Sequence, residues 1–345
     1  MRANGRTSHG ALLGALFSVG AVLALSACGG AQAPAQGQEA LDADPPAGQR
    51  TQDGPSHTDL KQGIEAIKAE RYDEAKPLLE KAALQSPKSS EAHFYLAVAR
   101  ERTGDRAGAE DAYKKSLAID PGGMEAMTNL SALYLDDPAR PDEAIALLKQ
   151  GLAKSPDSAA LHQNLAFAYG LKGDTANASK HFDAALHKGD NAELRLAYGD
   201  FLLKQKQPDK AAEQLRKALA QAPDNAAMVG TIAVMLAYSR AFGDCVKGLD
   251  RALKLKPDQP DWLVRRGTCR HELKDEPGAR ADYQAAIKAD EKFAAAHYYL
   301  GLSYLEEKKL KEGKAELGLA AKHGEGSSIG KSALEKLDSL SGKKK

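Results

Sequence analysis

The sequence has few aromatic residues and almost no net charge. Aromatic residues make up 6% of the 345 residues, and the formal net charge is +1. A chain so balanced gives no reason to expect a nucleic acid or an anionic membrane surface as a partner. Abundant Ala, Leu, Lys and Glu with few aromatic residues favours stacked short helices over sheets.

The chain also lacks two motifs that are common in metal and redox sites. It has no His-Glu-x-x-His and no paired Cys-x-x-Cys. Cys269 and His271 lie close together, but one such pair does not make a zinc site. His93, His162 and His297 recur at one position of a repeating pattern, which indicates packing rather than catalysis. We therefore predict no catalytic residue, no metal, no cofactor and no enzymatic activity.

Residues 1–27 have the pattern of a secretory leader. Two arginines precede the stretch 11–25, which is uncharged, mostly apolar and too short for a comfortable membrane span. The stretch runs into Leu-Ser-Ala-Cys at 25–28, which resembles a bacterial lipobox. The resemblance implies cleavage after Ala27 and lipidation of Cys28, which would anchor the chain to a membrane. An ordinary signal peptide with an incidental cysteine is the alternative.

Residues 28–55 are predicted to form a flexible tether from the lipidated Cys28. They are rich in Gly, Ala, Pro and Gln, and they contain too few large apolar residues to offset the cost of ordering. In enteric bacteria an Asp after the lipidated cysteine retains a lipoprotein in the inner membrane, but Gly29 follows here. The resemblance therefore favours an outer-membrane lipoprotein that faces the periplasm, with the outer face of the cytoplasmic membrane as the alternative.

From residue 56 to residue 327 a pattern of about 34 residues occurs eight times. In 90–123 two apolar helical runs are separated by Gly104-Asp105 and closed by Asp120-Pro121. Small residues recur at the eighth and twentieth positions of each repeat, where two helices would need to touch. The eighth position holds Gly63, Ala97, Ser131, Ala166, Gly199, Ala233, Gly267 and Gly301. The twentieth holds Ala75, Ala109, Ala144, Ala178, Ala211, Cys245, Ala279 and Gly313.

This pattern resembles the tetratricopeptide repeat (TPR). The resemblance implies an all-α fold, an α-solenoid of about eight TPR helix-turn-helix repeats in which each repeat contacts its neighbours. We expect residues 328–345 to form a capping helix and a basic tail, with Ser328 capping the helix 329–340. Prolines at 87, 121, 156, 223 and 257 are expected to stop the second helix of their repeats.

Cys245 and Cys269 fall on neighbouring helices of such a stack, in repeats six and seven. A disulfide between them would suit an oxidising compartment. Two small buried residues in a tight interface are the alternative. The spacing in sequence does not determine the distance between their Cα atoms.

The resemblance also implies a binding surface on the concave face, which is lined by fixed positions of the first helix of each repeat. Apolar residues at those positions are Phe94, Val98, Phe167, Leu171, Leu196, Leu203, Val234, Tyr238, Val264, Tyr298 and Leu302. An apolar strip of this kind suits an extended peptide or an amphipathic helix. The alternative is that some of these side chains pack between adjacent first helices.

Together these features predict a lipid-anchored scaffold or adaptor that binds protein partners. Such a protein would help to assemble an envelope complex, such as a pilus or secretin, motility, outer-membrane or peptidoglycan machine. It would contact the membrane only through its lipid anchor and would not bind nucleic acid. A non-enzymatic structural lipoprotein and, less in keeping with the sequence, an enzyme whose site the repeats support are the alternatives.

Overall fold

The computed structural model describes residues 55–136 and 140–341. The predicted leader, the lipidation site at Cys28, nearly all of the predicted tether and the end of the basic tail lie outside the described residues. Within them the chain forms seventeen α-helices and no strand. None of these helices has the length and apolar character that crossing a membrane requires.

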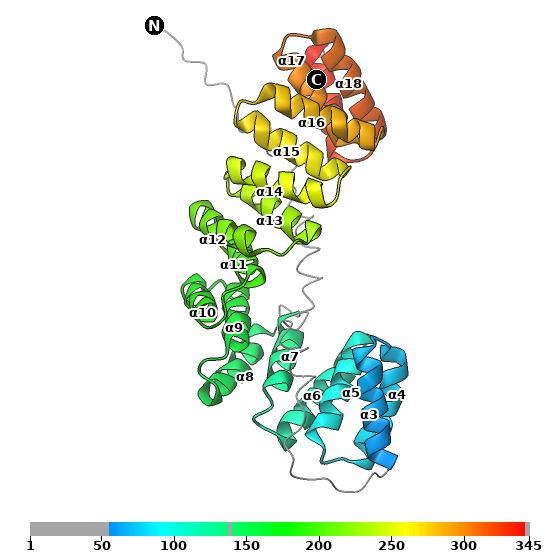
Figure 1. Ribbon diagram of the computed structural model, residues 1–345, viewed down its shortest axis with the longest axis vertical. Coiled ribbons are helices and arrows are strands. Elements are labelled where there is room, and N and C mark those ends of the chain that lie inside the picture. Colours follow the sequence, from blue (N-terminus) through cyan, green and yellow to red (C-terminus); the bar gives the residue numbers. More distant parts are fainter. Residues whose placement is uncertain (1–54, 137–139, 342–345) are drawn as a thin grey trace. The chain divides into compact units, whose positions relative to one another are not determined.

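Sixteen of these helices form eight hairpins, and the last helix follows them (Figure 1). The chain divides after Gly189 into two units, which we call the N-terminal unit (55–189) and the C-terminal unit (190–341). The N-terminal unit holds α3 (Pro55–Lys68), α4 (Tyr72–Gln85), α5 (Ser90–Arg102), α6 (Arg106–Ile119), α7 (Met124–Leu135), α8 (Pro141–Lys154), α9 (Ala159–Leu171) and α10 (Thr175–Lys188). The C-terminal unit holds α11 (Ala192–Lys204), α12 (Pro208–Gln221), α13 (Ala226–Tyr238), α14 (Phe242–Leu255), α15 (Pro260–Glu272), α16 (Glu276–Ala289), α17 (Ala294–Glu306), α18 (Leu310–His323) and α19 (Ser328–Leu340). The predicted fold class, an all-α solenoid of such repeats, is confirmed.

The small residues at the eighth and twentieth positions are buried in every repeat, as predicted. A Cβ atom added to Gly199 would lie 2.6 Å from Cδ2 of Leu215, and one added to Gly267 would lie 2.5 Å from Cε1 of Tyr283. The two helices of a repeat therefore approach too closely there for a larger side chain.

The turn between the two helices uses a left-handed residue. Gly104 and Gly173 have φ angles of 84° and 74°, and the following Asp105 and Asp174 cap the next helix. The same turn position also has positive φ in five repeats without glycine, at Glu70, Lys206, Arg240, Lys274 and Lys308. A left-handed non-glycine residue costs about 1–2 kcal/mol, so the hairpin packing must offset this strain.

The second helix of a repeat ends at the same place with or without proline. The helices α4, α6, α8, α12 and α14 all end two residues before their predicted proline. The helix α10 ends at Lys188 and α16 at Ala289, although Asp190 and Glu291 stand where the proline would be. Packing of each repeat on the next therefore determines where the helix ends, and proline only reinforces it.

The recurring histidines have a packing role. His93 Nε2 lies 3.1 Å from the carbonyl oxygen of Pro87, His162 Nε2 lies 3.1 Å from that of Pro156, and His297 Nε2 lies 3.0 Å from that of Glu291. Each ring thus hydrogen-bonds the connection from the preceding repeat. This agrees with the packing role that their periodic placement predicted.

Two features tie repeat six to repeat seven in the C-terminal unit. The first is a disulfide between Cys245 on α14 and Cys269 on α15, whose Cα atoms are 6.6 Å apart. The second is a network of charged side chains centred on the buried Asp282 of α16. Its carboxylate accepts hydrogen bonds from Arg266 Nη2 at 2.5 Å and Arg270 Nη1 at 2.9 Å. Arg266 also reaches Asp250 of α14 at 2.7 Å.

The final helix differs in detail from the prediction. Ser327 rather than Ser328 is its N-cap, and the Ser327 hydroxyl accepts a hydrogen bond from the amide of Gly330 at 3.2 Å. Ala333 is buried against Leu317, but Leu334 is 54% exposed and takes no part in this packing. The helix still covers the end of the C-terminal unit, because it packs on both α17 and α18.

Candidate partner-binding surface

The structure leaves ten of the eleven predicted surface residues accessible to solvent. Leu171 at the end of α9 is 50% exposed. The others are half-buried: Phe94, Val98, Phe167, Leu196, Leu203, Val234, Tyr238, Tyr298 and Leu302. We call these residues the A-helix surface of the unit in which they lie, because all of them lie on the first helix of a repeat.

Val264 is the exception, and its predicted place on this surface is wrong. Its side chain is fully buried in the core that includes Leu263 and Tyr283. Valine is shorter than Phe94 and Tyr298, which occupy the same position of other repeats, so its neighbours cover it completely.

The aromatic residues of the A-helix surface are held on one side by the core. In the N-terminal unit, the Phe94 ring meets the Tyr95 ring at 5.1 Å and 69°, and the Phe167 ring meets the fully buried Phe182 ring at 5.5 Å and 85°. Edge-to-face contacts of this kind favour one ring orientation. A partner would therefore meet rings whose positions are largely set beforehand.

The C-terminal unit holds Tyr298 in the same way. Its ring meets that of the buried Tyr299 edge-to-face, with 5.2 Å between centroids. Burial, with a smaller contribution from the charge of Glu335, raises the pKa of Tyr298 above its usual value. The hydroxyl is therefore neutral at physiological pH, and the ring offers an apolar face with one polar end.

A second apolar feature lies in the N-terminal unit and was not predicted. It is a hollow of ≈ 430 Å³ between α6, α7 and α8. Its lining residues are Lys114, Leu117, Ala118, Leu130, Tyr134, Glu143, Ala146, Leu147 and Gln150. The repeat pattern did not predict this hollow, because it does not specify the side chains that line it.

Arg140 lies beside this hollow. Its guanidinium stacks over the Tyr134 ring, with 4.2 Å between Cζ and the ring centroid. It also donates two hydrogen bonds to Glu110 of α6, at 2.6 and 2.9 Å, and two to Glu143, at 2.6 and 3.3 Å. The hydrogen bonds from Arg140 to Glu110 are the largest cause that lowers the pKa of Glu110, to about 2. Arg140 therefore links α6 to the start of α8.

The sequence contains one Gly-x-Ser-x-Gly match, at residues 326–330. In hydrolases that use this motif the serine stands on a sharp turn from a strand to a helix. Here Ser328 begins α19 directly after the turn that follows α18. The match therefore lacks the structural context of a nucleophile elbow.

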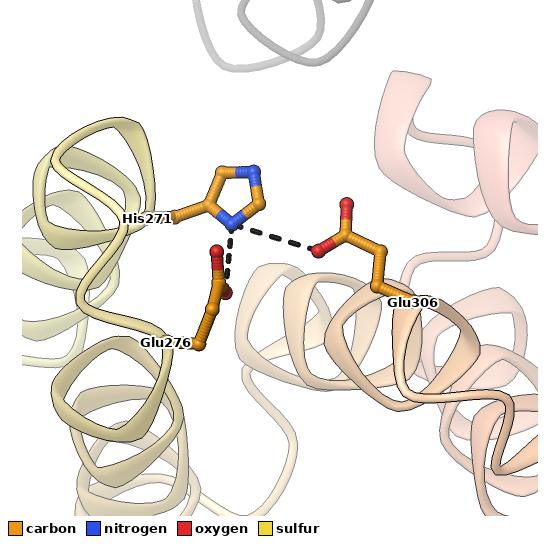
Figure 2. Close-up of side chains that lie close together, drawn as sticks. All are labelled: His271, Glu276 and Glu306. Atoms are coloured by element: carbon orange, nitrogen blue, oxygen red, sulfur yellow. Dashed lines mark hydrogen bonds and ion pairs between the residues drawn. The ribbon is translucent and has the colours of Figure 1, made fainter.

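One cluster in the described part of the chain has side chains spaced for a metal ion: His271, Glu276 and Glu306. Figure 2 shows both carboxylates next to the same nitrogen of the imidazole ring. The sequence did not predict this group because Glu306 belongs to the next repeat and comes close to His271 only through the stacking of α15 and α17.

Family models decide which class of repeat this is. One tetratricopeptide repeat model matches residues 60–123, 246–292 and 277–325, and a second matches residues 171–235. The matched segments cover more than half of the chain. The chain belongs to the tetratricopeptide repeat family. TPR folds are scaffolds for protein–protein interaction.

No curated protein sequence matches this TPR protein. Among solved structures, the C-terminal part of a TPR repeat-containing protein from Cytophaga hutchinsonii is 14% identical with a TM-score of 0.56, over 70% of this chain and 99% of that one. A thermophilic TPR protein from Thermus thermophilus is 26% identical with a TM-score of 0.46, over 53% of this chain and 99% of that one. YrrB, described as a TPR protein with an unusual peptide-binding site, is 19% identical with a TM-score of 0.45, over 58% of this chain and all of that one. The likeness to the Cytophaga protein shows the fold alone.

Proposed function

We propose that this TPR protein is a lipid-anchored scaffold of the bacterial cell envelope, which binds a protein partner on its A-helix surface and helps to assemble an envelope complex. The observation that carries the proposal is the recurrence of large, partly buried apolar side chains that keep some solvent exposure on the first helices of successive repeats, from Phe94 to Leu302. The leader and the lipobox pattern ending at Cys28 support the envelope location.

The A-helix surface suits a partner of defined chemistry. Full burial of a large apolar side chain is worth roughly 1.5–3 kcal/mol, and covering the part of each side chain that is still exposed contributes a fraction of this before the cost of association. An amphipathic helix or an extended peptide with apolar residues can make several such contacts along successive repeats. Binding of this kind needs no catalytic residue, so we propose a scaffold and not an enzyme.

A single substitution with a matched control tests the binding surface. Leu171→Glu places a charge on the A-helix surface at a position that is 50% exposed, so folding should tolerate it. Leu84→Glu makes the same change on α4, the second helix of its repeat, where the side chain is 82% exposed. Cross-linking, affinity capture and mass spectrometry of the full-length protein in its native cells then compare both variants with wild type.

We expect Leu171→Glu to lower the yield of one stoichiometric partner about tenfold, which corresponds to about 1.4 kcal/mol of binding free energy. Leu84→Glu should capture the partner as wild type does. Melting curves of both variants should match the wild-type curve. If the two variants capture the partner equally, the binding site lies elsewhere. If wild type captures no stoichiometric partner, a purely structural lipoprotein is favoured.

The lipid anchor is tested separately. Cys28→Ser removes the thiol that accepts the diacylglycerol, so the variant should stay unprocessed or leave the detergent phase. The intact mass of wild-type protein should include acyl chains. A mature wild-type chain without acyl mass contradicts the anchor but leaves the binding surface untouched.

A further inference from the structure

The cluster of His271, Glu276 and Glu306 brings together three side chains from two repeats (Figure 2). His271 lies in the last turn of α15, Glu276 begins α16, and Glu306 ends α17. The imidazole is 16% exposed, while the carboxylates are 35% and 46% exposed. The ring is thus set into the protein surface, and the carboxylates leave a path from solvent.

Both carboxylates approach the same ring atom. Nδ1 of His271 lies 3.0 Å from Oε2 of Glu276 and 3.7 Å from Oε2 of Glu306. A single Nδ1–H can point along only one of these directions. The other carboxylate therefore lies close to the ring nitrogen and to the first carboxylate without accepting a hydrogen bond from the ring.

The nearby cations are engaged elsewhere. Arg280 and Lys309 both pair with Glu307, the residue after Glu306. Among the residues that the structure describes, neither Glu276 nor Glu306 pairs with a lysine or an arginine. The charges of Glu276 and Glu306 also act on the buried Tyr283. After burial and the charge of Tyr299, they contribute to raising its pKa. The cluster therefore carries negative charge that no neighbouring side chain neutralises.

The distances within the cluster fit a small divalent cation. Zinc binds imidazole nitrogen and carboxylate oxygen at about 2.0–2.2 Å, so two ligand atoms of a tetrahedral site lie about 3.3–3.5 Å apart. The two measured distances, 3.0 and 3.7 Å, lie on either side of this value. The three ligand atoms all lie within 4.8 Å of one another, so rotation of the Glu306 side chain at the helix end can close the site.

We propose that His271, Glu276 and Glu306 bind one zinc ion, which joins repeat seven to repeat eight. The ion replaces the Nδ1 proton of His271, and its two charges balance the two carboxylates. Three protein ligands leave the fourth position of the ion to water. Since a TPR array is held together by contacts between neighbouring repeats, a bound ion would stabilise this junction directly.

Zinc titration of the full-length protein, stripped of metal with a chelator, tests the site. Isothermal calorimetry with zinc alone measures stoichiometry and affinity, and cobalt serves as a visible-light probe of coordination. The variants are Glu306→Gln, His271→Gln and, as the matched control, Glu272→Gln. Glu272 is next to His271 on α15 but is not part of the cluster.

We expect wild type and Glu272→Gln to bind the same zinc ion with equal affinity. Glu306→Gln should weaken that binding at least about tenfold, and His271→Gln should abolish it. Melting curves without metal identify any variant that fails to fold, and the half-exposed Glu306 site keeps the test valid if His271→Gln is unstable. No wild-type binding below about 1 mM zinc, or equal binding by Glu306→Gln and Glu272→Gln, overturns the proposal.

Discussion

The N-terminal and C-terminal units are built from the same helical hairpin, but different interactions join their repeats. In the N-terminal unit the polar links are mostly between neutral groups or near the surface. The buried Asn164 of α9 donates hydrogen bonds to the Ser131 hydroxyl at 3.0 Å and to the Thr128 carbonyl of α7 at 3.2 Å. Arg140 and the hollow beside it lie between repeats two and three.

The C-terminal unit uses covalent and buried ionic links instead. The Cys245–Cys269 disulfide and the Asp282 network both connect repeat six to repeat seven. All four of its turn positions between paired helices are left-handed residues other than glycine, whereas two of the three described in the N-terminal unit are glycine. The repeat pattern therefore specifies each hairpin, while the stability of each junction depends on residues outside the pattern.

The largest expected effect is that of reducing the disulfide. In the chain-entropy model a bridge over 24 residues stabilises by about 3–4 kcal/mol, and contacts within an array are local. Reduction should therefore speed hydrogen exchange in α14 and α15 of the full-length protein and leave the N-terminal unit unchanged. The Cys245→Ala, Cys269→Ala double variant is the control, because the reductant should not alter its exchange.

The same experiment checks the bond itself. Thiol labelling of denatured, unreduced protein should modify neither Cys245 nor Cys269. Full labelling of both would restore the alternative of two buried thiols in a tight interface.

Removing Asp282 should have the next largest effect. Asp282→Ala leaves Arg266 and Arg270, whose side chains are 17% and 23% exposed, with only Asp250 and the more distant Asp275 as acidic partners, which should cost about 2–3 kcal/mol. Local unfolding free energies from hydrogen exchange should fall in α15 and α16. Asp111→Ala in the N-terminal unit removes an exposed ion pair with Lys115 and should change stability by less than about 0.5 kcal/mol. Similar small effects for both variants would remove the distinction between the units.

A third effect should appear only in the N-terminal unit and only at low pH. Burial, followed by the charges of His162, Lys180 and Lys149, lowers the pKa of His181 to about 4. The unfolded chain takes up this proton near pH 6.5, so between pH 6.5 and pH 4 it binds more protons than the folded chain. Folding stability should then fall as the pH drops, by about 1 kcal/mol because the ring is partly solvated.

The His181→Gln variant should show a smaller loss of stability than wild type between pH 7 and pH 5. His187→Gln changes an exposed histidine on the same helix and should follow the wild-type curve. Chemical denaturation at both pH values, with hydrogen exchange to locate the change, measures this. Parallel curves for all three proteins would show that the His181 environment does not matter.

The smallest expected effect concerns the turns. Lys206→Gly or Lys308→Gly relieves left-handed strain of about 1–2 kcal/mol but adds unfolded-state entropy worth about 0.5–1 kcal/mol. Each should stabilise the C-terminal unit by about 0.5 kcal/mol. Gly104→Lys should destabilise the N-terminal unit by a similar amount. If the two glycine variants lower the unfolding free energy and Gly104→Lys raises it, turn strain does not differ between the units.

The sequence predicted those features that depend on one repeat alone. The small residues at the helix crossing and the helix ends near proline both follow from local spacing. Predictions were weaker where a neighbouring repeat decides the outcome. Stacking brings together side chains that the repeat pattern does not specify. Four features depend on such side chains: the burial of Val264, the hollow beside Arg140, the Asp282 network and the group around His271.

Site-specific photo-cross-linking in native cells tests most directly the central claim that the first helices of the repeats bind the partner. A photoreactive residue would replace Leu171 or Tyr298, one on the A-helix surface of each unit. Leu84 and Lys217, on second helices of the same two units, are the controls. We predict that one protein partner cross-links from Leu171 and Tyr298 and not from Leu84 or Lys217. Cross-linking that is equal at all four positions, or confined to the second helices, would contradict the claim.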